Sequence, residues 1–173
     1  MKVASFATII LLLILACNDR SKSNATNAER DHVAQENKEE RNKQVALECI
    51  RAWSSGNMNL ILSHTATNAV DYGDGSTPPA RGIDTMKMFM NDWRFAVNEY
   101  RASNEIAVAD SNYVFVYADW DGSFKANFMG MKTAGKSFHF RDVDIFAFND
   151  VGKVIEHRAV LFSTFLKNIA SGK

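Results

Sequence analysis

The feature of this sequence that most limits its possible folds lies in the second half of the chain. There, apolar and polar residues alternate in segments of strand length. After Asn98, five such segments are separated by turns rich in Asp, Asn and Gly. Neighbouring side chains of a strand point to opposite faces of a sheet, so this pattern predicts an antiparallel meander with one buried face. The expected strands are residues 99–109, 113–121, 124–129, 137–148 and 153–165.

Residues before these strands repeat at helical spacing instead. An apolar stripe over residues 45–53 predicts a helix that Gly56 ends. Asn57 can cap a short second helix, and the apolar residues between 86 and 97 recur every three or four positions as in a third helix. Only a brief strand, residues 69–72, interrupts them. Helices followed by a meander predict an α+β domain whose helices cover one face of the sheet.

The charge and cysteine content exclude several classes of protein. In 173 residues, 20 Lys plus Arg balance 20 Asp plus Glu, so no overall field attracts nucleic acid. This length suits one domain. The two cysteines give no disulfide framework, and Cys49 lies on an apolar helix face, where a lone cysteine is expected to be a small buried hydrophobe.

The N-terminal segment predicts export. An apolar run at residues 3–16 follows Lys2; it suits a signal peptide and is shorter than the roughly 20 residues that span a bilayer. Its end, Ile14-Leu15-Ala16-Cys17, resembles the lipid-attachment motif of bacterial lipoproteins. The resemblance implies cleavage before Cys17, lipidation of Cys17 with acyl chains such as palmitate, and anchoring at the bacterial cell envelope outside the cytoplasm. An ordinary secretory signal is the alternative.

These features divide the chain into three parts. Residues 1–16 are expected to be the signal peptide. Residues 17–43 carry the lipidated cysteine and a polar tether that has too few large apolar residues to fold alone. Residues 44–170 are expected to form the α+β domain.

The order of elements and two segments resemble a known superfamily. The segments are residues 130–136, GMKTAGK, and residues 144–157, DIFAFNDVGKVIEH. Over residues 44–166 the chain resembles the nuclear transport factor 2-like superfamily, and within it SnoaL-like proteins and ketosteroid isomerases. The resemblance implies a cone-shaped, curved antiparallel or mixed sheet wrapped around three N-terminal helices and enclosing a pocket. It does not fix the function, because this scaffold hosts isomerases, cyclases, dehydratases, binding proteins and oligomerisation modules.

Asp144 and His157 are predicted to lie together on the concave face of the sheet. If Phe148 is opposite Lys153 across the turn, Asp144 lies opposite His157. Alternation gives this face the apolar residues Phe138, Phe140, Phe146, Phe148, Ile155, Ala159 and Leu161. We therefore take Asp144 and His157 as candidate catalytic residues. A buried ion pair that only fixes strand register is the alternative.

The resemblance implies only part of an acid–base site. Asp144 matches the aspartic acid that ketosteroid isomerases keep protonated to hydrogen-bond the substrate oxygen. Their tyrosine falls at Cys49, and their catalytic base falls beside Asp71 and Asp74 without matching either. The acid–base aspartate of SnoaL-type cyclases falls within residues 159–162, where no aspartate occurs. These further roles do not carry over.

Five aromatic residues are candidates for the ligand-binding wall of the pocket, although their spacing is also explained by core packing alone. They are Trp53, Tyr72, Phe89, Trp93 and Trp120. No metal site is expected, because His32, His64 and His139 lack ligand spacing. No cofactor is expected either, since no phosphate-binding loop or nucleophile motif occurs.

Three functions remain open. The favoured one is a binding protein that holds a hydrophobic small molecule at the envelope, because the matching bases are missing. The second is a general acid–base enzyme acting on a carbonyl compound, in which His157 moves the proton and Asp144 stabilises the oxyanion. The third is a structural role as a homodimer, through an apolar stripe on the outer sheet face formed by Val143, Ile145, Ala147, Val160 and Phe162.

Overall fold

The computed structural model describes the backbone of residues 7–172 and the side chains of residues 26–172. Two compact units make up the chain, one ending at Asn37 and the other beginning at Lys38. The described part of the first unit is the N-terminal portion of helix α1 (Ala7–Ser55). The predicted signal peptide and Cys17, the predicted site of lipid attachment, lie outside the residues whose side chains are described.

Within the described residues, no helix combines the length and the apolar character that a membrane crossing requires.

Helix α1 includes the polar segment that the sequence assigns to a tether. This segment contains Ala, Glu, Lys and Arg, which have high helix propensity, alongside several Asn and Ser residues. Side-chain pairs four residues apart add support, as between His32 and Glu36 and between Glu40 and Gln44. The last turns of α1 belong to the second unit, where Ala46, Cys49, Ile50 and Ala52 are buried. The helix thus passes from a solvated segment into the hydrophobic core.

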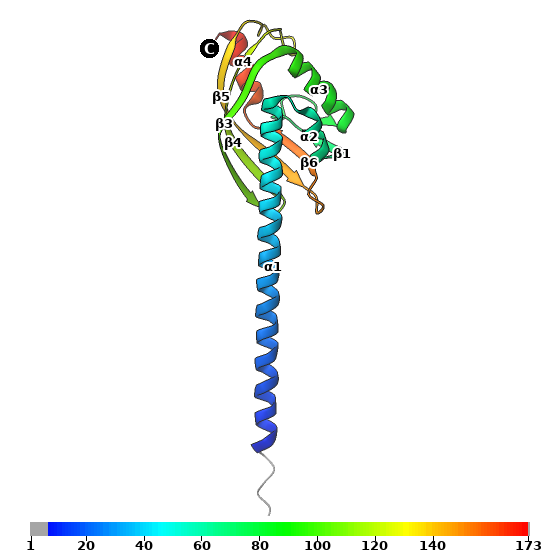
Figure 1. Cartoon of the computed structure of the whole chain (residues 1–173), viewed down its shortest axis with the longest axis vertical. Helices are drawn as coiled ribbons and strands as arrows, with labels where there is room; N and C mark the ends of the chain where they lie inside the picture. The colour runs from blue at the N-terminus through cyan, green and yellow to red at the C-terminus, as the bar shows by residue number, and fades with distance from the viewer. Residues whose placement is uncertain (1–6, 173) are drawn as a thin grey trace, which may run out of the picture. The chain divides into compact units, whose positions relative to one another are not determined.

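The second unit is an α+β domain, as predicted (Figure 1). Its further elements are α2 (Met58–His64), β1 (Thr65–Asp71), β2 (Ala80–Arg81), α3 (Ile83–Ala96), β3 (Val97–Asp110), β4 (Tyr113–Phe124), β5 (Ser137–Phe148), β6 (Val154–Ala159) and α4 (Phe162–Ser171). The strands form one sheet in the order β2-β1-β6-β5-β4-β3.

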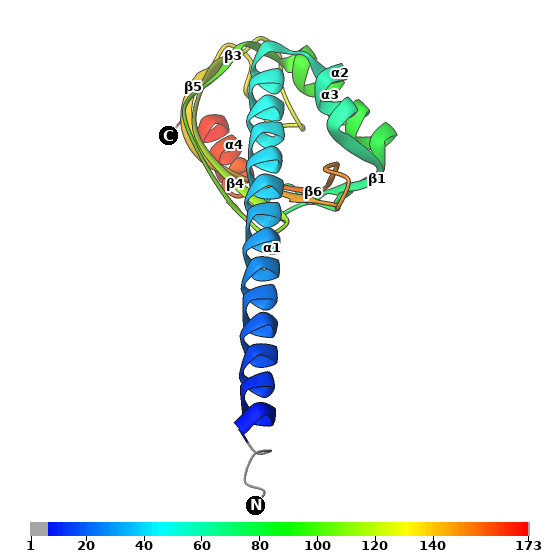
Figure 2. The same ribbon diagram turned by 60° about the horizontal axis from the view of Figure 1, so that its bottom comes forward.

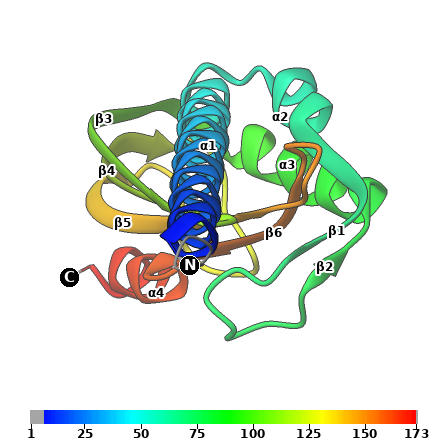
Figure 3. The same ribbon diagram turned by 90° about the horizontal axis from the view of Figure 1, so that it is seen from below.

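The sheet is mixed, because β1 and β6 are parallel while the other neighbouring strands are antiparallel. Strands β3, β4 and β5 curve along one side of the domain, and α2 and α3 lie on the other (Figure 2). Seen along α1, the last turns of this helix lie between the two sides (Figure 3). The expected curved sheet around three helices is present.

Two of the expected strands are wrong. Residues 125–129 form a loop instead of a strand, in which the Thr133 hydroxyl donates to the Ala126 carbonyl and accepts from the Phe128 amide. The last strand ends at Ala159, and helix α4 follows. The apolar residues of this helix recur at i, i+3, i+4 and i+7, which is a helical stripe: Phe162, Phe165, Leu166 and Ile169.

Gly122 lies where strands β3 and β4 come unusually close to each other. A Cβ atom built at this position would lie 2.5 Å from Cζ of Phe138 and 2.9 Å from the carbonyl oxygen of Glu99. Opposite Gly122, the pairing of β3 and β4 is irregular between Asn98 and Arg101, and Glu99 has a positive φ of 50°. Such irregularities bend a strand and increase its twist. Only glycine permits this close approach of the two strands.

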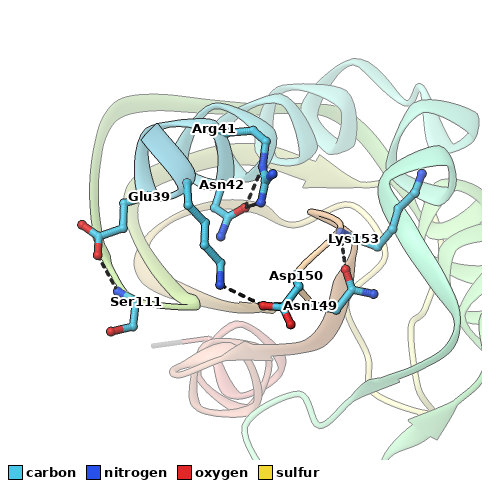
Figure 4. A network of polar contacts seen from close by, with 8 residues as sticks. Glu39, Arg41, Asn42, Ser111, Asn149, Asp150 and Lys153 are labelled. Carbon is cyan, nitrogen blue, oxygen red and sulfur yellow. Dashed lines mark hydrogen bonds and ion pairs between the residues drawn. The ribbon is translucent and has the colours of Figure 1, made fainter. Parts of the chain in front are cut away.

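Polar contacts hold the domain end of α1 against two turns of the sheet (Figure 4). Glu39 accepts a hydrogen bond of 2.9 Å from the backbone amide of Ser111, in the turn between β3 and β4. Lys38 forms an ion pair of 3.0 Å with Asp150, in the turn between β5 and β6. These contacts position the following turns of α1 over the inner face of the sheet.

Candidate functional site

A cavity of about 130 Å³ lies between helices α1, α2 and α3 and the inner face of the sheet. Its aromatic lining residues are Trp53, Phe89, Tyr100, Trp120, Phe140, Phe146 and Phe162. Its charged or titratable polar lining residues are Asp71, Asp142, Asp144 and His157. A mostly apolar cavity with a few converging polar groups is the usual pattern of a small-molecule site.

Three of the five aromatic residues predicted from the sequence line this cavity. Trp53 of α1 and Phe89 of α3 stack with ring centroids 6.5 Å apart, and Trp120 of β4 lies on the sheet side. The other two do not line it. Trp93 is 1% exposed and belongs to the core around Phe124, while Tyr72 packs under the guanidinium group of Arg158 at 4.2 Å.

Two aromatic lining residues were missed by the sequence analysis. Tyr100 of β3 stacks on Trp120 with centroids 4.7 Å apart and an angle of 5° between the rings. Phe162 faces the cavity from α4, whereas the sequence analysis assigns it to the outer face of a strand. Because the register of β3 is irregular near Glu99, simple alternation does not predict which way Tyr100 points. For Phe162, the helical spacing of apolar residues in α4 was a signal that the sequence analysis could have used.

His157 lies between two carboxylates. Its Nε2 is 3.1 Å from Oδ1 of Asp144, and its Nδ1 is 3.2 Å from Oδ1 of Asp71. Strand β1 brings Asp71 to this place, because it runs parallel to β6 with Asp71 paired to His157. The structure thus joins the two predicted residues and adds a third that the sequence analysis found merely nearby.

The predicted register of this pair is wrong by two residues. Asp144 is paired with Ala159, and His157 with Phe146. One residue of the shift arises at the turn, where Phe148 pairs with Val154 instead of Lys153, and a bulge between Ala147 and Phe148 adds the second. As a result Val154 and not Ile155 lines the cavity. A shift of two keeps side chains on the same face. Asp144 and His157 therefore still meet, diagonally.

The pKa of His157 reflects its two carboxylate neighbours. Burial would lower this pKa, but the charges and hydrogen bonds of Asp71 and Asp144 outweigh burial and raise it to about 10. Burial would likewise raise the pKa of Asp71, but His157 and the backbone amide of Gly73 lower it below its usual value. At neutral pH the site therefore contains an imidazolium ion whose two N–H groups both face carboxylates.

Asp144 has one oxygen left over. Its Oδ1 contacts His157, while Oδ2 is buried and has no hydrogen-bond partner among the described residues. Tyr100 lies close enough to Asp144 for that charge, after burial, to raise the pKa of its hydroxyl well above the usual value. An unpaired buried carboxylate oxygen costs free energy unless a ligand binds to it.

A second carboxylate lies beside Asp144. Burial, followed by the charge of Asp144, raises the pKa of Asp142 to about 6. Oδ1 of Asp142 accepts backbone hydrogen bonds from Val143 at 2.7 Å and Leu161 at 2.8 Å. Asp142 thus joins β5 to the start of α4 and adds a further negative charge near the cavity.

Cys49 also lines the cavity, and it is 3% exposed. Burial raises the pKa of its thiol to about 12, so the thiol is neutral and unreactive, as expected for a buried hydrophobe. In the part of the chain with described side chains, no cluster of three or more His, Cys, Asp or Glu residues could hold a metal ion.

The sequence matches a family model described as SnoaL-like polyketide cyclase over residues 43–161. This range includes every lining residue except Phe162. No curated protein matches the chain.

Solved structures with a similar fold come from several bacteria. A protein assigned as a polyketide cyclase from Xanthomonas campestris pv. campestris is 12% identical, with a TM-score of 0.68 over 76% of this chain and 98% of that one. AclR from Streptomyces galilaeus, assigned as a hydroxylase, is 21% identical, with a TM-score of 0.65 over 78% of this chain and 83% of that one. A Catenulispora acidiphila protein with a ketosteroid isomerase-like fold, solved in complex with trimethylamine, is 10% identical, with a TM-score of 0.55 over 66% of this chain and 82% of that one. These likenesses concern the fold.

Proposed function

This chain belongs to the SnoaL-like polyketide cyclase family, and we propose that it binds an apolar small molecule in the cavity and holds a polar group of that molecule at Asp144. The cavity volume of about 130 Å³ suits a body about the size of one ring, since an engineered apolar cavity of about 150 Å³ binds benzene.

The observation that carries this proposal is the unpaired Oδ2 of Asp144. Leaving a buried polar atom without a hydrogen bond costs about 1–3 kcal/mol, and more for a charged one. The rest of the surrounding wall is mainly aromatic and aliphatic, so a ligand that donates an N–H or O–H to this oxygen would gain both a hydrogen bond and apolar contact.

Native mass spectrometry of the full-length chain purified from a bacterial lysate tests this proposal. A molecule that recurs in independent preparations should be released on denaturation, and Asp144→Asn combined with Trp53→Ala should abolish its retention. The matched control is Asp121→Asn, because Asp121 is a solvent-exposed aspartate that pairs with His139 in the same way. Retention of the molecule by the double variant would contradict the site.

Acid–base catalysis on the bound molecule is the second candidate function. It is favoured by the arrangement Asp71–His157–Asp144, in which an imidazolium ion supports one carboxylate oxygen of a cavity-lining aspartate and leaves the other without a hydrogen-bond partner among the described residues. In this mechanism Asp144 takes a proton from a carbon next to a carbonyl group and later returns it. His157 then positions Asp144 and balances its charge, because an imidazolium has no unprotonated ring nitrogen that could act as the base.

Deuterium exchange distinguishes catalysis from binding alone. Cyclohexanone, a carbonyl compound with a single ring, is incubated with the protein in D₂O, and the loss of its α-proton signals is followed by NMR. Catalysis predicts exchange above the buffer rate that Asp144→Asn abolishes and Asp121→Asn preserves. Exchange at the buffer rate would leave binding as the function.

We also propose that the domain is exported and lipid-anchored at the cell envelope through Cys17. The support is the N-terminal sequence: a basic residue, an apolar run of signal-peptide length, and a cysteine in lipid-attachment context. Metabolic labelling with a palmitate analogue should mark the protein, and Cys17→Ser should lose the label and leave the membrane fraction. Cys49→Ser is the control, because that thiol is buried in the domain.

A further inference from the structure

The charges around the cavity do not balance. Three carboxylates, of Asp71, Asp142 and Asp144, line it against the single imidazolium of His157. Neither Lys nor Arg occurs among its lining residues in the part of the chain with described side chains. The cavity therefore has an excess of negative charge within mostly apolar walls, where charge interactions are stronger than in bulk water.

The three carboxylates receive different numbers of hydrogen bonds and ion pairs from the rest of the protein. Asp71 contacts His157 and accepts a hydrogen bond of 2.9 Å from the backbone amide of Gly73. Asp142 accepts from two backbone amides. Asp144 shares His157, and its buried Oδ2 has no partner among the described residues although Asp144 is only 7% exposed. The least compensated negative charge therefore lies at the wall of the cavity.

The aromatic residues of the wall, like the carboxylates, favour a positively charged ligand. The face of an aromatic ring carries negative electrostatic potential and attracts cations, most strongly in Trp and Tyr. Trp53, Tyr100 and Trp120 all line the cavity that Asp144 lines. A cation placed there would lie near these electron-rich rings and near a carboxylate, whereas an anion would be repelled by the carboxylate.

We propose that the ligand is cationic: an amine or quaternary ammonium group on an apolar body about the size of one ring, with the cation beside Asp144. This inference rests on the proposed binding function and names the chemical class of the ligand. An ammonium N–H donated to Oδ2 would form a charge-assisted hydrogen bond, which is stronger than one from a neutral hydroxyl.

Three probes of matched size test the sign of the charge by isothermal titration calorimetry with the full-length chain at neutral pH. Benzylamine is positive, benzyl alcohol neutral and benzoate negative, and each has one ring and one short polar group. Benzylamine should bind on the order of tenfold more tightly than benzyl alcohol, because a charge-assisted contact replaces a neutral one. Benzoate should bind most weakly.

Two variants locate the charge preference. Asp144→Asn should bring the affinity for benzylamine down to that for benzyl alcohol, while the alcohol itself binds within about twofold of its original affinity because the wall contacts are unchanged. Retained alcohol binding shows that the variant is folded. Asp121→Asn, outside the cavity, should preserve the full preference for the amine.

The outcomes separate this inference from the proposed function. If benzyl alcohol binds as tightly as benzylamine to the native protein, the cationic ligand is excluded while binding in the cavity stands. If the amine preference survives in Asp144→Asn, its source is elsewhere and the assignment to Asp144 is wrong. If none of the probes binds, a ligand of one ring is excluded altogether, and native mass spectrometry still decides whether a different molecule is held.

Discussion

Asp71 and His157 are partners both in the backbone and in their side chains: they face each other in the parallel pairing of β1 and β6, and their charged groups lie 3.2 Å apart. This relationship brings a carboxylate from early in the chain to a site otherwise built from β5 and β6. It also holds the imidazole ring from the side opposite Asp144, so the ring orientation is fixed by two contacts.

Replacing His157 should destabilise the domain strongly. His157→Gln removes the cation between Asp71 and Asp144 and leaves two carboxylates close together in a partly buried place. We expect the free energy of unfolding at neutral pH to fall by about 3 kcal/mol, as when one partner of a buried ion pair is removed. Denaturant unfolding followed by circular dichroism measures this loss.

The matched control for this change is His139→Gln. His139 also pairs with an aspartate, Asp121, but both side chains are well exposed. Such surface pairs contribute about 0–1 kcal/mol. Equal losses in the two variants would show that the buried arrangement has no special role in stability.

The stability of the domain should depend on pH through His157. Its pKa is raised from 6.5 to about 10 in the folded protein, so its stabilising contribution is complete below pH 6.5 and is lost as the pH rises to about 10. The difference in unfolding free energy between the native protein and His157→Gln should therefore shrink across this interval. A difference that stays constant would mean that the imidazole does not titrate there.

Removing the carboxylate of Asp74 should loosen helix α4. The N-cap residue of this helix, Leu161, provides no side-chain cap, and Asp74 instead accepts hydrogen bonds of 2.9 Å from the amide and the hydroxyl of Ser163. Asp74→Ala should cost about 1 kcal/mol, as other lost helix caps do. Hydrogen exchange should accelerate in α4, and Asp84→Ala, an exposed first-turn acid of α3, should leave α4 unchanged.

The outer face of the sheet should mediate a homodimer. Ile106 and Val108 are both 63% exposed, and Val108 pairs with the partly exposed Phe115 on the neighbouring strand. We expect the native protein to sediment as a dimer and Val108→Lys to sediment as a monomer, because a buried unpaired charge is costly. Met88→Lys, at an exposed position on α3, should preserve the dimer. A native monomer would exclude this interface.

The sequence analysis predicted elements with strong local periodicity and failed where distant contacts decide. The α+β class, the first three helices and the meander from β3 to β5 follow from local patterns. Asp144 and His157 were placed together despite a wrong register, since an error of two residues preserves the face of a strand. In contrast, no local signal indicates that β1 runs parallel to β6, so the contact of Asp71 with His157 could not be derived.

The missed helix has a different cause. The predicted last strand ran to Phe165, although the spacing of Phe162, Phe165 and the apolar residues that follow fits a helical stripe better. The turn that separates β6 from α4 depends on Asp142, whose carboxylate accepts from the Leu161 amide. A strand residue far away in the sequence therefore determines where the last strand ends.

Gly122 affects the packing of the sheet around the cavity although it does not line the cavity. At this position strand β4 lies so close to Glu99 and Phe138 that only a hydrogen atom fits where other residues have a methyl group. A mutation to any larger residue would push Phe138 or the backbone at Glu99 aside and change the shape of the whole inner face. The packing of the inner face can therefore be changed from a position that does not line the cavity.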